Sequence, residues 1–125
     1  MRPTDPVVRL ARVQAIYFVV TGVWPLVSIR SFEAITGPKA DRWLVKTVGV
    51  LVGISGLALG LAVRRRRFPP ELVLVAAGNA AALAAIDAVY VAKRRISPVY
   101  LLDAAAELVL VAGWVLLGWR DRTES

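Results

Sequence analysis

Residues 72–92 read LVLVAAGNAAALAAIDAVYVA, and this stretch decides the fold. It contains a single charged residue, Asp87, and no proline. A helix needs about 20 mainly apolar residues to cross a hydrocarbon core roughly 30 Å thick. Because the stretch has that length and that composition, it predicts a transmembrane helix.

Three more stretches have similar length and apolar character, at residues 13–29, 43–63 and 99–119. The last opens with Ser97 as a predicted N-cap and Pro98 at the first helical position. So few residues separate it from the helix at 72–92 that these two must form an antiparallel hairpin.

The four stretches together predict one domain over residues 1–125. Its expected fold class is all-α, a membrane-spanning antiparallel four-helix bundle with a left-handed twist. The composition agrees, because 58% of the residues are hydrophobic and the mean hydropathy is +0.62. Soluble domains are about 45–50% apolar.

The net charge of +7 first raises the possibility of a nucleic-acid partner. However, nearly all Lys and Arg side chains fall in short runs between apolar stretches rather than along one polar face. This spacing is typical of membrane flanks, so we expect a lipid bilayer as the partner and no nucleic acid. The Arg64, Arg65, Arg66, Arg67 run is expected to bind anionic lipid headgroups.

The chain lacks both Cys and His. Thiolate chemistry, disulfides, covalent haem attachment and imidazole-bound metals are therefore excluded. Any metal would have to be a hard cation held by oxygen atoms. We expect no catalytic residue, no metal ligand and no cofactor.

Orientation in the membrane follows the distribution of Lys and Arg. Nine of the 16 flank the helices on the side of the two termini and of Arg64–Arg67, against seven on the other side. We therefore expect a multi-pass protein of the bacterial cytoplasmic (inner) membrane with both termini in the cytoplasm.

Each predicted helix carries a row of polar or small residues at alternating spacings of three and four. This 3.5-residue period keeps one face turned inward in left-handed bundles. The rows are Gln14, Tyr17, Thr21, Trp24 and Ser28; Lys46, Gly49, Gly53, Gly56 and Gly60; Ala76, Ala80, Leu83, Asp87, Tyr90 and Arg94; and Tyr100, Asp103, Glu107, Leu110 and Trp114. We interpret the four glycines as helix-packing positions, because small residues let backbones approach closely in lipid.

Three acidic residues fall on these rows near one membrane face. At about 1.5 Å per residue, Asp87 lies some 7 Å from its helix end, Asp103 about 6 Å and Glu107 about 12 Å from theirs. A charge at the bilayer centre costs about 2.5–3.5 kcal/mol on the insertion scale, so these side chains need partners. The residues expected to form a ligand- or proton-binding site are Asp87, Asp103, Glu107, Lys46, Tyr90, Trp24, Ser28 and Arg94.

Two interpretations of this cluster stay open. The acids and the nearby Lys46 and Arg94 could form an ion-pair network that only fixes helix register. Alternatively, the acids could bind or transport protons or a small cationic or amphipathic solute.

Three functional classes follow from these interpretations. Binding or transport is favoured, and an accessory or assembly subunit of a larger membrane complex is the alternative. An intramembrane enzyme is the least favoured class, because no nucleophile or phosphate-binding loop accompanies the carboxyl groups. Four helices enclose little space, so a channel would need a homodimer or a larger assembly.

The connection between the first two helices, residues 31–43, is longer than a hairpin requires. Phe32 and Ile35 could lie in the membrane interface or cover the polar pocket, while a plain tether is the simpler alternative.

Four short motifs carry a family resemblance: SFE at 31–33, TGPK at 36–39, WLV at 43–45 and VYLLD at 99–103. With them the chain resembles uncharacterised small bacterial four-helix integral membrane proteins. The resemblance implies the fold and brings no activity, cofactor or site residue. The chain differs from small multidrug transporters, which have a glutamate in the first helix where this sequence has Gln14 and Thr21.

Overall fold

The computed structural model describes residues 5–37 and 42–123. Over these residues the chain forms five helices and no strand: α1 (Asp5–Val27), α2 (Ile29–Thr36), α3 (Arg42–Arg65), α4 (Pro70–Ala92) and α5 (Tyr100–Thr123). By length and composition, α1, α3, α4 and α5 can each cross a membrane. The predicted all-α fold with four long apolar helices is confirmed, and α2 is an addition. The handedness of the bundle stays a prediction.

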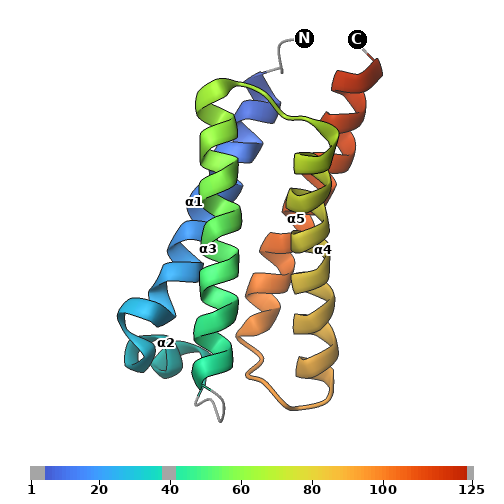
Figure 1. Cartoon of the computed structure of the whole chain (residues 1–125). Helices are drawn as coiled ribbons and strands as arrows, with labels where there is room; N and C mark the ends of the chain where they lie inside the picture. Colours follow the sequence, from blue (N-terminus) through green and yellow to red (C-terminus); the bar gives the residue numbers. More distant parts are fainter. Residues whose placement is uncertain (1–4, 38–41, 124–125) are drawn as a thin grey trace.

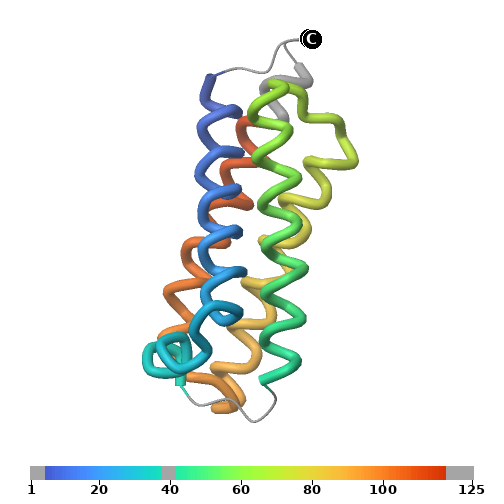
Figure 2. Tube along the Cα trace, turned by 60° about the vertical axis from the view of Figure 1, so that its left-hand side comes forward, coloured from blue at the N-terminus to red at the C-terminus, as the bar shows by residue number. Residues whose placement is uncertain are grey.

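The long helices form two neighbouring pairs, α1 with α3 and α4 with α5 (Figure 1). Each long helix runs opposite to the one before it along the chain (Figure 1). Consequently α1 begins and α5 ends at one end of the bundle, which we name the terminal end. The opposite end carries α2 and the α4–α5 connection (Figure 2), and we name it the α2 end.

Glycines bring α1 and α3 into backbone contact. A Cβ atom built on Gly22 would lie 2.5 Å from the Gly49 carbonyl oxygen and 2.6 Å from the Gly53 nitrogen. A Cβ on Gly56 would lie 2.9 Å from the Ala15 carbonyl oxygen. Three of the predicted packing glycines therefore lie where α1 approaches most closely.

Gly53 and Gly60 differ from Gly49 and Gly56, because nothing lies within 4 Å of a Cβ built on either residue. Gly53 is nevertheless buried, and its backbone nitrogen faces Gly22. Gly60 is half-buried beside the buried Leu59, so the described residues make no close helix contact at Gly60.

The boundaries of α1 also differ from those predicted. The helix begins at Asp5 rather than at residue 13, and Arg9 and Arg12 lie within it as exposed side chains. Long arginine side chains can reach the interface from inside a helix, so they do not mark its start. The helix ends at Val27, because Ser28 leaves helical geometry (φ −149°, ψ 89°) and caps α2 instead.

The predicted connection at residues 31–43 overlaps the helix α2. Ser28 is its N-cap and accepts a hydrogen bond from the Ser31 backbone N–H at 3.3 Å. Gly37 ends it at φ 95°, a left-handed conformation that favours glycine. Residues 38–41 of the predicted connection lie outside the described residues.

Two helices end with an arginine in the left-handed region, Arg66 after α3 (φ 53°) and Arg94 after α4 (φ 58°). At the end of α4, the N–H of Arg95 donates to the Tyr90 carbonyl at 2.9 Å and that of Arg94 to the Val91 carbonyl at 3.0 Å. These two bonds form a Schellman motif, in which glycine usually occupies the left-handed position. A side chain there costs about 1–2 kcal/mol.

We therefore expect Arg94→Gly to raise the free energy of unfolding by about 1 kcal/mol, since glycine removes the left-handed strain. Thermal unfolding in detergent, followed by circular dichroism, measures the change. Arg95→Gly is the matched control, because Arg95 is equally exposed but has an ordinary φ, and it should not stabilise. Equal effects of the two variants would contradict this explanation.

Candidate carboxyl site inside the bundle

Three acidic side chains come together in the half of the bundle nearer the α2 end. Asp87 belongs to α4 and is 5% exposed, while Glu107 of α5 is 1% exposed. Asp103, one turn before Glu107, is half-buried and accepts a hydrogen bond from the Tyr17 hydroxyl of α1. We name Asp87, Asp103, Glu107 and Tyr17 the carboxyl cluster.

The members of the carboxyl cluster interact electrostatically with one another. Asp87 lies within electrostatic range of Asp103 and of Glu107, and Asp103 and Glu107 also interact. The cluster therefore concentrates acidic groups where water is scarce.

Among the described residues, no basic side chain forms an ion pair with the carboxyl cluster. The ion pairs in the described residues are Glu33–Arg42 (2.7 Å) and Asp5–Arg66 (3.0 Å), neither of which includes a member of the cluster. Asp87 Oδ2 and Glu107 Oε2 are buried without a hydrogen-bond partner. The ion-pair network that the sequence left open does not form among the described residues.

Three further residues of the predicted site, Lys46, Tyr90 and Arg94, lie outside the cluster. Lys46 is exposed near the start of α3, and Tyr90 is 40% exposed with Lys93 Nζ 5.7 Å from its ring centre. Arg94 lies beyond the last residue of α4, in the left-handed position described above. Arg94 was placed on the inward row on the assumption that the helix continues to that residue, but α4 ends at Ala92.

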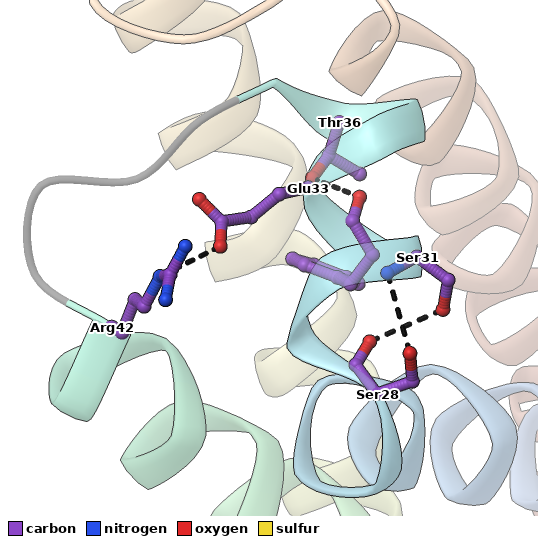
Figure 3. Close-up of polar contacts among 6 residues, drawn as sticks. Ser28, Ser31, Glu33, Thr36 and Arg42 are labelled. Carbon is purple, nitrogen blue, oxygen red and sulfur yellow. Dashed lines mark hydrogen bonds and ion pairs between the residues drawn. The ribbon is translucent and has the colours of Figure 1, made fainter.

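Trp24 and Ser28 shape the corner between α1 and α2. Trp24 Nε1 donates to Ser31 Oγ at 2.9 Å, and its ring packs edge-on against Phe32 with 5.2 Å between ring centres. The Ser28 hydroxyl caps α2, and Ser31 Oγ donates back to the Ser28 carbonyl (Figure 3). Both predicted site residues therefore hold α2 on α1 rather than contacting a carboxyl group.

Sequence reasoning placed Tyr17 on the inward row but not in the site. Its hydroxyl is the hydrogen-bond donor that α1 supplies to the cluster. Its depth in the bundle could have indicated this role. Tyr17 lies between Gln14 and Thr21 on the inward row, and a buried tyrosine hydroxyl usually finds a polar partner.

A layer of paired and apolar side chains separates the cluster from the terminal end. Gln14 Nε2 donates to the Ala76 carbonyl at 2.8 Å, and Trp114 Nε1 donates to Gln14 Oε1 at 2.6 Å. Phe18 and Leu110 are buried between this layer and the acids. The polar groups of Gln14 are thus satisfied, and the cluster is closed off on this side.

The donor set does not resemble a metal centre. Among residues 5–37 and 42–117, no group of three or more acidic side chains has a geometry that could hold a metal ion. Carboxyl groups can take up protons and attract cations, and the cluster offers three of them. Comparison of the chain with family models, curated proteins and solved structures gives no match, so function is argued from this geometry.

Proposed function

We propose that this multi-pass membrane protein binds, and moves across the membrane, protons or a small cationic or amphipathic solute at the carboxyl cluster. The observation that carries the proposal is the pair of buried, unpartnered oxygens, Asp87 Oδ2 and Glu107 Oε2, in the absence of a described basic partner. A buried charge needs compensation. Protons or a bound cation would supply it.

The alternative, an accessory subunit with a purely structural cluster, has less support. A structural role for buried charges requires opposite charges that pair in good geometry. Here Lys93, Arg94 and Arg95, which lie between Asp87 and Asp103 in the sequence, are all exposed, and so is Lys46 of α3.

Flux into vesicles tests the proposal. The purified protein is reconstituted into liposomes that contain a pH-sensitive dye, and a pH gradient is imposed with and without a lipophilic organic cation outside. We expect the gradient to collapse faster with protein than in empty liposomes, because the cluster offers a polar site inside the bundle. If the gradient collapses at the same rate in liposomes with protein and in empty liposomes, both with and without the cation, the proposal is contradicted.

We further propose the bacterial cytoplasmic membrane as the location, with both termini on the cytoplasmic side. The resemblance to bacterial membrane proteins and the excess of Lys and Arg at the terminal end support this placement. Arg64, Arg65, Arg66 and Arg67 are all exposed there, where they would contact anionic lipid headgroups.

Single cysteines can test this orientation, because the native chain has none. Ala34→Cys in α2 and Pro69→Cys before α4 are suitable, since both positions are exposed and neither change alters the charge. In intact cells we expect a membrane-impermeant maleimide to label the first variant and to label the second only after the membrane is opened. The reverse pattern would place the termini outside.

A further inference from the structure

We infer that α2 is a hinged lid that controls access from the aqueous side to the carboxyl cluster, and that the Glu33–Arg42 ion pair is its latch. This inference rests on the proposed function, because it assigns a regulatory element to the same site. The interior of the bundle is closed on one side of the cluster. Toward the terminal end the Gln14–Trp114 layer closes it, so access must come from the α2 end or from the lipid.

The cluster lies close to the α2 end. At about 1.5 Å per residue, Asp103 lies about 5 Å from the first residue of α5 and Asp87 about 7 Å from the last residue of α4. α2 lies crosswise at this same end (Figures 1 and 2). Its C-terminal end reaches the α4–α5 connection, where a Cβ built on Gly37 would lie 3.6 Å from Ser97 Cβ.

Non-helical residues bound α2 at both ends, and we take them as the hinge positions. Ser28 interrupts the path from α1 to α2 with non-helical dihedral angles, and Gly37 follows α2 at φ 95°. Trp24 and Ser28 attach α2 to α1, but most side chains of α2 itself are half-buried or exposed, and Thr36 is its buried residue. Elements that bury few of their own side chains open at lower free-energy cost than the core.

An ion pair holds the other side of this helix. Glu33 extends from α2 toward Arg42 at the start of α3, and Arg42 Nε lies 2.7 Å from Glu33 Oε1 (Figure 3). The Glu33 side chain is 10% exposed and that of Arg42 is 57% exposed, so water reaches the pair from one side. Such a pair can break and reform without unfolding the bundle.

A disulfide can lock the lid. The variant G37C/S97C places two Cβ atoms at a separation that suits a disulfide, about 3.5–4.5 Å. Full-length protein in detergent is treated with a water-soluble carbodiimide and glycine methyl ester, and mass spectrometry follows the modification of each carboxyl group. We expect modification of Asp103 and Glu107 to slow by about tenfold or more when the disulfide is oxidised, and to recover on reduction.

Internal and matched controls accompany this measurement. Exposed Glu71, at the other end of the bundle, should be modified at the same rate throughout. The single variants G37C and S97C report the strain of a side chain at position 37 and should not respond to oxidant. Failure of the pair to cross-link, or equal modification rates of Asp103 and Glu107 in the locked and unlocked protein, would overturn the lid.

The latch is tested separately by Arg42→Gln, which we expect to accelerate modification of Asp103 and Glu107 several-fold. Arg30→Gln is the matched control, because Arg30 is an exposed arginine of α2 outside the described ion pairs. Equal rates in the two variants would remove the latch. The modification rates report only access to the carboxyl groups. They can therefore contradict the lid while flux into liposomes still depends on Glu107, and flux can fail to depend on Glu107 while the rates still support the lid.

Discussion

Gly22→Ala is expected to lower the free energy of unfolding by about 2–3 kcal/mol, the upper part of the range for overpacked interiors. The added methyl group would meet the Gly49 carbonyl oxygen at 2.5 Å and the Gly53 nitrogen at 2.6 Å. These are backbone atoms of α3, so no side-chain rotation relieves the contact and the two helices must separate. Because lipid supplies no hydrophobic drive between helices, lost packing is not replaced.

Thermal or denaturant unfolding in detergent measures this loss. Gly78→Ala is the matched control: Gly78 is exposed in the middle of α4, and nothing lies within 4 Å of a Cβ built on it. That variant should be as stable as the native protein or more so, because alanine favours a helix over glycine by roughly 0.5–1 kcal/mol. Similar losses for both variants would show that α1 and α3 are not in backbone contact.

Glu107→Gln is expected to reduce flux into liposomes by at least about tenfold while leaving the bundle folded. The amide keeps the shape of the side chain but neither releases a proton nor carries a negative charge. Since no described basic residue pairs with Glu107, the substitution breaks no ion pair, and stability should stay the same or rise.

The structural alternative predicts the opposite sign for stability. Removing one member of a buried ion pair costs about 3–5 kcal/mol, so a Glu107→Gln protein that unfolds readily would favour that alternative. Glu71→Gln is the matched control, because it makes the same change on an exposed residue of α4. A flux equal to that of the native protein in both variants would exclude Glu107 from the transport path.

Much of the fold is predictable from the sequence because the bilayer imposes simple rules. Apolar length alone locates four helices, and the spacing of unusual residues identifies which faces turn inward. Asp87 and Glu107 were predicted to be interior on that spacing, and both are buried. The glycine row likewise anticipated the close approach at Gly49 and Gly56.

The remaining features depend on helix ends and on contacts between distant segments. Lys46 was assigned to the acids because its helix face is correct, but a long side chain at a helix start can equally turn toward water. Arg94 was misassigned because the helix ends at Ala92, two residues earlier. The α2 helix has only eight residues, far fewer than a membrane span needs, so a search for long apolar stretches does not find it. The Tyr17–Asp103 contact joins residues 86 positions apart.

The central claim is that the buried carboxyl groups exchange protons or cations with the surroundings. Infrared difference spectroscopy of the protein in liposomes, recorded after a pH step or after addition of an organic cation, observes those groups directly. We predict a carboxyl C=O difference band that Glu107→Gln and Asp103→Asn diminish and Glu71→Gln leaves intact. A band that is absent, or that is identical in all three variants, would contradict the claim.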